Sequence, residues 1–142
     1  MNKFSPNIFL IFVSNIIFLS VSCRENIVLP DEFAGNVNEP LELNNFNSYT
    51  FLIDAKKISV KYKKQADFSS FYTQISISIT DYSSGTFRFK IKDNQSVNRF
   101  SYFGNTNEYN YKESLSGFVP YLIEIEADDF SGKLKIQLNT AY

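Results

Sequence analysis

The sequence predicts an all-β protein, an antiparallel β-sandwich of about seven or eight short strands. Apolar and polar residues alternate strictly in several short runs, which is typical of a sheet with one buried and one solvated face. No stretch after the first 22 residues has the apolar period of a helix. Two antiparallel sheets packed face to face bury such strands best, and a small β-barrel is the alternative.

The expected strands cover most of the chain from residue 48 onward. The clearest is 75–80, which reads ISISIT. The same alternation is found at 58–62, 87–92, 123–127 and 133–138. Further strands are expected at 49–54, 98–103 and 108–112.

Two segments of similar sequence are expected to form hairpin turns. Residues 81–85 read DYSSG and residues 129–132 read DFSG, and each joins two alternating runs. Asp and Ser satisfy backbone groups in turns, Gly accepts a positive φ, and the aromatic residue can cover the end of the core. Shared turn chemistry and internal duplication explain the likeness equally well.

The N-terminal residues have the arrangement of a secretory signal peptide. Lys3 precedes an almost unbroken apolar run at 8–19, and Ser20, Val21 and Ser22 lead to Cys23. This run is too short to span a bilayer comfortably. The arrangement resembles the type II signal peptide of bacterial lipoproteins, with the leucine one position further from the cysteine than is usual in that family.

The resemblance implies that Cys23 is acylated with diacylglycerol and that the chain is cut just before it. Residues 1–22 would then be removed as the signal peptide. Cys23 is the only cysteine, so no disulfide can form within the chain. The alternatives are an ordinary signal peptide and a retained membrane anchor. Arg24 stands where some such lipoproteins carry the aspartate that retains them in the inner membrane, which favours the outer membrane.

Residues 23–47 are expected to form a tether between the acylated cysteine and a β-sandwich domain at 48–142. The segment contains two prolines and a glycine, and no period of 2 or 3.6 runs through it. A tether would hold the domain away from the bilayer, while multiple acyl chains attach it stably. Its apolar residues nearest the domain are expected to form a short first strand at the edge: Val37, Leu41, Leu43 and Phe46.

The composition argues against catalysis, cofactors and nucleic acid binding. The chain has no histidine, so neither a Ser-His-Asp nor a Cys-His site is possible. No glycine-rich phosphate-binding motif occurs. Paired carboxylates remain, as in glycosidases, but Glu124 and Glu126 share the solvated face of one strand. The net charge of −1 provides no argument for a nucleic acid partner.

Tyrosines around a further expected hairpin tip at residues 104–105 are candidate ligand-binding residues. Tyr102, Tyr109 and Tyr111 would lie on or near one sheet surface, where they could stack against sugar rings or contact a partner protein. The alternative is that cross-strand tyrosine pairs stabilise the sheet without any ligand.

Acidic residues in expected turns could supply oxygen ligands for calcium if those turns converged. No calcium-binding loop motif is present, and acids in turns commonly satisfy backbone groups, so no metal site is expected. The residues concerned are Asp81, Asp93, Asp128 and Asp129.

Two basic segments could form a positive patch for anionic lipid head groups or acidic glycans if their strands were neighbours. Alternatively, Glu124 and Glu126 pair with Lys133 and Lys135 across strands, and exposed lysines protect strand edges from aggregation. The basic residues are Lys56, Lys57, Lys61, Lys63 and Lys64 in one segment and Arg88, Lys90 and Lys92 in the other.

The sequence therefore predicts a membrane-anchored lipoprotein of the cell envelope whose sandwich is a non-enzymatic binding module for a protein or glycan. The alternative is a structural accessory subunit of an envelope assembly. A glycan-binding module should expose the tyrosines on a groove or flat face. An accessory subunit should expose an unprotected edge strand or a large apolar patch. An enzyme should bring two carboxylates to roughly 5–10 Å in a cleft.

Overall fold

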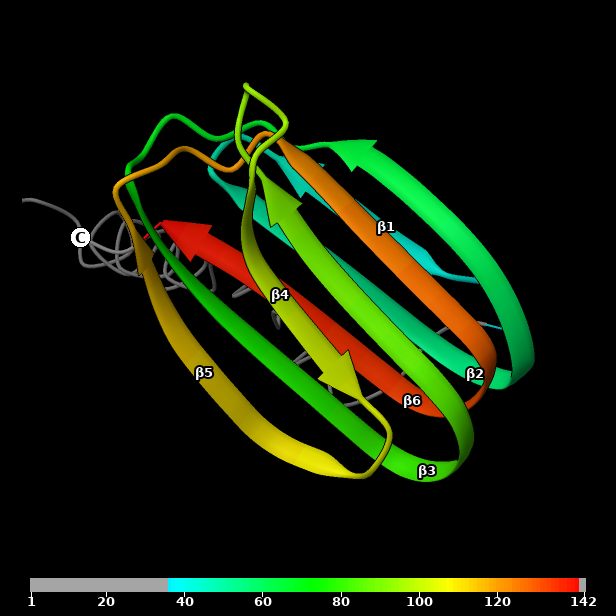
Figure 1. Cartoon of the computed structure of the whole chain (residues 1–142). Coiled ribbons are helices and arrows are strands. Elements are labelled where there is room, and N and C mark those ends of the chain that lie inside the picture. The colour runs from blue at the N-terminus through cyan, green and yellow to red at the C-terminus, as the bar shows by residue number, and fades with distance from the viewer. Residues whose placement is uncertain (1–35, 141–142) are drawn as a thin grey trace, which may run out of the picture. The chain divides into compact units, whose positions relative to one another are not determined.

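The computed structural model describes residues 36–140, which form one antiparallel sheet of six strands (Figure 1). The predicted signal peptide, Cys23 and most of the predicted tether lie outside the described residues. Within 36–140, no helix is long and apolar enough to cross a membrane. The strands are β1 (Leu41–Asn45), β2 (Ser48–Gln65), β3 (Tyr72–Lys92), β4 (Asn98–Gly104), β5 (Glu108–Ser116) and β6 (Leu122–Thr140).

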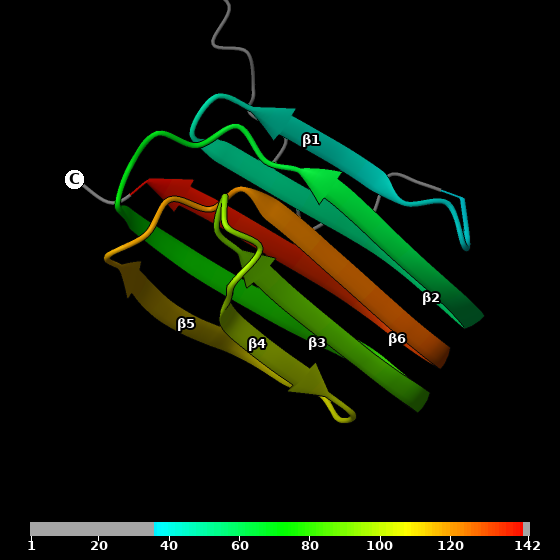
Figure 2. The same cartoon turned by 45° about the horizontal axis from the view of Figure 1, so that its top comes forward.

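Three long strands, β2, β3 and β6, bend near their middles and fold the sheet over itself (Figures 1 and 2). The strand order is β1-β2-β6-β3-β4, and β5 pairs with β3 beside its first arm. The first layer contains β1, β5 and residues 48–55, 72–80 and 132–140 of the long strands. The second layer contains β4 and residues 58–65, 86–92 and 122–128. The sheet is open, so the β-sandwich prediction is confirmed and the closed barrel is not formed.

The prediction that the two similar turn segments form hairpins is wrong. They form adjacent corners of bent strands instead. β3 pairs with β6 on both sides of its corner, and Ser84 of one segment lies opposite Ser131 of the other. Positive φ angles at Asp81 (53°), Gly85 (82°) and Asp129 (46°) turn the backbone. The same chemistry that closes a hairpin therefore bends a continuing strand here. Pairs of predicted short strands consequently become the two arms of longer ones.

The core lies between the two layers and is built from the apolar members of the alternating runs. Phe130, at the corner of β6, fills the end of the core nearest the bends. Its ring centroid lies 6.1 Å from that of Phe87 and 6.2 Å from that of Tyr82, the aromatic residue of the other corner. The aromatic residues of both corners thus cover the end of the core. The largest fully buried side chains include Tyr49, Phe87, Phe89, Phe130, Ile75, Ile77, Ile79, Ile91, Ile123, Leu134, Ile136 and Leu138.

One side of the sandwich is closed by Glu42 of β1. Its carboxylate accepts a hydrogen bond from the Tyr62 hydroxyl and lies 3.6 Å from the ammonium group of Lys64, so it joins the two layers. Burial and the hydrogen bond to Glu42 raise the pKa of Tyr62 to about 12. β1 therefore presents Glu42 and Asn44 to the interior, and Leu41 and Leu43 point outward with 42% and 50% of their surfaces exposed.

β1 takes up residues from the segment that was expected to be a tether. It pairs with β2 from Leu41 to Asn45, so the sheet begins before residue 48. Two of the four residues expected in a short first strand, Leu41 and Leu43, lie in it. Val37 and Phe46 lie just before and just after the strand, and both are exposed.

Candidate functional site

Two of the three predicted tyrosines close the other side of the sandwich. Tyr102 of β4 and Tyr111 of β5 have ring centroids 5.0 Å apart, and both pack partly buried against the core. Burial raises the pKa of Tyr102. A hydrogen bond donated to Glu113, together with burial, raises the pKa of Tyr111 to about 12. These two rings therefore connect the layers as packing residues.

Tyr109 is not brought to the other two tyrosines and is 73% exposed. The reason is a β-bulge, because Ile77 lies opposite Tyr111 whereas Ile79 lies opposite Glu108. The extra residue reverses the alternation of β5, so Tyr109 points outward. β4 and β5 also pair with different arms of β3, so the segment after Gly104 crosses between layers and is not the predicted hairpin.

The acidic turn residues do not converge on a calcium site. Asp81 pairs with Lys133 at 2.8 Å, Asp129 lies beside Ser59, and Asp93 is bound to Arg99. Across residues 36–140, no group of three or more His, Cys, Asp or Glu side chains is placed to hold a metal ion.

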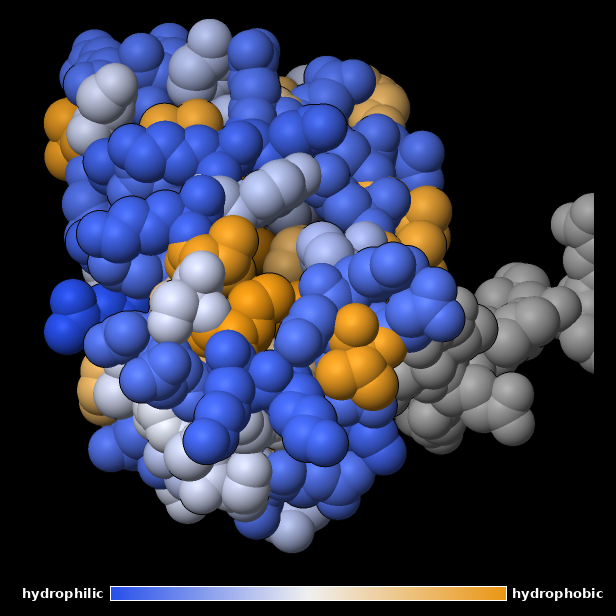
Figure 3. All heavy atoms as spheres, turned by 90° about the vertical axis from the view of Figure 1, so that its right-hand side faces the viewer, coloured by the Kyte–Doolittle hydropathy of each residue, from blue (hydrophilic) through white to orange (hydrophobic). Residues whose placement is uncertain are grey.

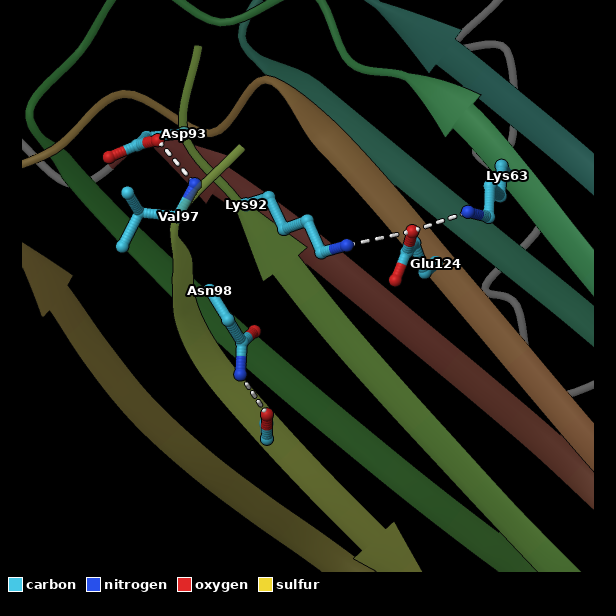
Figure 4. A network of polar contacts seen from close by, with 7 residues as sticks. Lys63, Lys92, Asp93, Val97, Asn98 and Glu124 are labelled. Carbon is cyan, nitrogen blue, oxygen red and sulfur yellow. Dashed lines mark hydrogen bonds and ion pairs between the residues drawn. The ribbon is translucent and has the colours of Figure 1, made fainter. Parts of the chain in front are cut away.

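The outer face of the second layer carries Lys61 and Lys63 of one basic segment and Arg88, Lys90 and Lys92 of the other, but β6 lies between the two strands. Lys64 lies on the inner side beside Glu42. Glu124 of β6 lies 2.9 Å from the ammonium group of Lys63 and 3.0 Å from that of Lys92 (Figure 4). Glu126 pairs with Lys61 at 2.8 Å. The predicted pairing with lysines 133 and 135 is wrong, because those residues occupy the other arm of the same strand. Each glutamate instead separates two basic rows.

We expect Glu124→Gln to lower the free energy of unfolding at pH 7 by about 1 kcal/mol, because two ammonium groups lose their shared carboxylate. Hydrogen bonding by Lys63, opposed by burial and supported by Lys92, lowers the pKa of Glu124. A lowered folded-state pKa contributes stability above the unfolded-state pKa, and this contribution is lost as the pH falls through the lowered value. Urea unfolding should therefore show a difference at pH 7 that shrinks below about pH 4.

The matched control is Glu126→Gln, whose carboxylate has one lysine partner and a more exposed side chain. It should cost less stability than Glu124→Gln at pH 7. A cost of Glu124→Gln that is equally large in acid would show that the charge of this carboxylate is not its source.

A hollow that combines aromatic residues with polar side chains lies at the end of the sandwich opposite the bends. The connections 66–71, 93–97 and 117–121 meet there (Figures 1 and 2). They surround a cleft of about 540 Å³. We call it the loop-end cleft, and it is lined by Phe68, Ser69, Phe71, Asp93, Asn94, Gln95, Arg99, Gly117, Phe118, Val119 and Tyr121.

Aromatic side chains supply the apolar part of the loop-end cleft. Phe68 and Phe118 pack against the core, whereas Phe71 and Tyr121 remain 59% and 41% exposed. Large apolar residues usually leave solvent when a fold allows it, so exposed aromatics in a hollow indicate a contact surface. Sequence reasoning missed these residues because they come from two connections, 66–71 and 117–121, that have no periodicity. Aromatic residues in segments that do not read as strands were the available signal.

Backbone hydrogen bonds tie the three connections together. The Ala66 amide donates to the Tyr121 carbonyl at 2.8 Å, and the Gly117 amide donates to the Phe71 carbonyl at 3.1 Å. The Tyr121 amide donates to the Lys92 carbonyl at 2.9 Å. The cleft is therefore held in shape by the fold itself, without a ligand.

The 93–97 connection is organised around the carboxylate of Asp93, whose side chain is only 8% exposed. One oxygen accepts hydrogen bonds from the amides of Gln95 and Val97, both at 2.9 Å, and the other accepts one from Nε of Arg99 at 2.7 Å. Figure 4 shows the bond from Val97. Burial alone would raise the pKa of Asp93, but these three donors outweigh it and lower the pKa.

The side of the molecule on which the strands bend has a different character. Figure 3 shows hydrophilic residues over most of it and a small group of apolar residues near its centre. Two further hollows, of about 360 and 390 Å³, have charged or small residues in their walls. Neither contains an aromatic side chain among its described lining residues. Of these three hollows, the loop-end cleft is the one that combines aromatic surface with hydrogen-bonding groups.

No protein-family model matches this chain, and no curated protein sequence matches it. The geometry of the site therefore carries the functional argument.

Proposed function

We propose that this protein is a membrane-anchored lipoprotein of the cell envelope whose β-sandwich is a non-enzymatic binding module. The proposed site is the loop-end cleft, and the proposed ligand is a sugar residue of a glycan. The observation that carries the proposal is the presence of exposed Phe71 and Tyr121 beside amide and guanidinium side chains in one hollow. Aromatic rings contact the apolar faces of sugar rings, while planar polar groups bind their hydroxyls.

The side-chain chemistry of the cleft supports binding without catalysis. The chain has no histidine to act as a general base. Among the described residues that line the cleft, Asp93 is the one carboxylate, and it is already bonded by Arg99 and two amides. A glycosidase would place two carboxylates across its cleft.

A second candidate function is that of an accessory subunit in an envelope assembly, and β1 favours it. β1 is an edge strand whose outward side chains include Leu41 and Leu43, and Phe46 in the following turn is 67% exposed. Exposed edge strands with apolar side chains pair readily with other chains. Replacing Leu43 by lysine should then release the partner in a co-purification assay without affecting the cleft.

The glycan proposal is tested by an array of immobilised glycans probed with the purified protein. Tyr121→Ala should weaken binding about tenfold, because loss of one stacked ring removes roughly 1 kcal/mol and its buried area. The matched control is Tyr109→Ala, which removes an exposed tyrosine outside the cleft and should change nothing. Loss of binding in the control alone would move the site to β5. Binding by neither variant nor wild type would contradict the glycan proposal.

A further inference from the structure

The guanidinium of Arg99 is the positive charge in the wall of the loop-end cleft. Its Nε donates to the buried carboxylate of Asp93 at 2.7 Å, while 43% of the side chain remains exposed. Asp93 is itself held by the amides of Gln95 and Val97. Arg99 is therefore fixed in orientation before any ligand arrives.

A guanidinium has five N–H donors, and the contact through Nε uses one of them. In residues 36–140, Asp93 is the acceptor that binds Arg99, and it does so through Nε. The two terminal nitrogens form the opposite edge of the same plane. That edge matches the two oxygens of a second carboxylate, which it can bind through parallel hydrogen bonds.

We infer that the loop-end cleft selects an acidic sugar, whose carboxylate binds the terminal nitrogens of Arg99 while its ring lies against Tyr121 or Phe71. This inference rests on the proposed glycan-binding function and adds the class of sugar. Asp93 acts as a positioning residue, because its carboxylate is already bonded by Arg99 and two backbone amides and so holds the guanidinium in orientation. The Asn94 and Gln95 side chains line the same wall and provide donors and acceptors for the sugar hydroxyls.

A purely structural role of Arg99 would explain its bond to Asp93. It would not explain why Arg99 lies partly exposed beside aromatic residues in the wall of the cleft. The connection 93–97 is already closed by the Asp93 amide, which donates to the Val97 carbonyl at 3.1 Å, and by the Ser96 amide, which donates to the Asp93 carbonyl at 3.0 Å. Apart from the Asp93 carboxylate that Arg99 already pairs with, the other described lining residues are uncharged, so Arg99 adds a half-exposed cation to the hollow. A charge beside exposed aromatic rings is the arrangement expected for a ligand that is both cyclic and anionic.

The test uses the full-length protein and a panel of oligosaccharides that contain hexuronic acids, each paired with its carboxyl-reduced form. The wild-type protein should bind the acidic member of at least one pair about tenfold or more tightly than the reduced member. Arg99→Ala should abolish this preference and leave binding of the reduced form. Arg99→Lys retains the charge beside Asp93, so it keeps the fold, and it should lose most of the preference because an ammonium cannot bind bidentately.

Arg88→Ala is the matched control, since it removes an arginine from the outer face of the second layer and should keep the preference. Equal binding of both members of every pair would overturn the inference and leave the proposed function standing. Failure to bind any member of the panel would overturn both. A preference that Arg88→Ala removes and Arg99→Lys retains would also overturn the inference.

Discussion

Replacing Gly85 by alanine is expected to destabilise the sandwich by at least about 3 kcal/mol. Gly85 has a φ of +82°, and a Cβ atom there would lie 2.3 Å from the carbonyl carbon and oxygen of Asp129. Those atoms belong to the backbone of the neighbouring corner, so they cannot move aside without separating β3 from β6. Urea unfolding followed by circular dichroism should show a much lower midpoint or an unfolded protein.

Gly117→Ala is the control for the backbone angle alone. Gly117 has nearly the same φ, +83°, but no atom lies within 4 Å of its virtual Cβ. This variant should lose only about 1 kcal/mol, the cost of placing a side chain in the left-handed region. Equal losses of stability in the two variants would mean that the close approach of the two corners adds nothing to the cost of an alanine at position 85.

Cys23→Ala is expected to abolish attachment of the protein to the membrane. Under the proposed function, the wild-type mature chain begins at Cys23 and carries added acyl mass, and the variant lacks both the mass and the anchor. The effect should be nearly complete, because stable attachment needs more than one acyl chain and Cys23 would carry them all. Intact-mass analysis of protein from its native membrane measures the added acyl mass, and membrane fractionation measures the attachment.

Ser22→Ala keeps the cysteine and a small residue before it, so it should retain both the acyl mass and the membrane location. An unmodified wild-type chain would contradict the lipoprotein proposal. A Cys23→Ala variant that stays in the membrane with residues 1–22 attached would instead support a retained anchor.

The location of the strands was predictable because alternation is a local property. Ile75, Ile77 and Ile79 alternate with polar residues in the sequence, and all three are completely buried. The same local chemistry could not distinguish a hairpin from a corner at residues 81–85. That choice depends on whether the next strand pairs with the previous one or with β6, which is a contact far along the chain.

The candidate site was the least predictable part for the same reason. Tyr109 was expected beside Tyr111, and one extra residue in β5 turned it outward. Phe71 and Tyr121 lie in different connections and Arg99 lies in β4, so no spacing in the sequence relates them. Their proximity follows from the strand order.

The sequence by itself determined the all-β class, the buried face of the strictly alternating strands and the aromatic cover of the core, since periodicity and residue type decide these locally. It also carries the motif at residues 19–23 on which the lipoprotein proposal rests. Only the tertiary structure decided that the long strands bend, that Glu124 stands between Lys63 and Lys92, and that three connections enclose a cleft. These features depend on which strands become neighbours. Strand pairing is selected by the packing of the complete core, which involves residues far apart in the sequence.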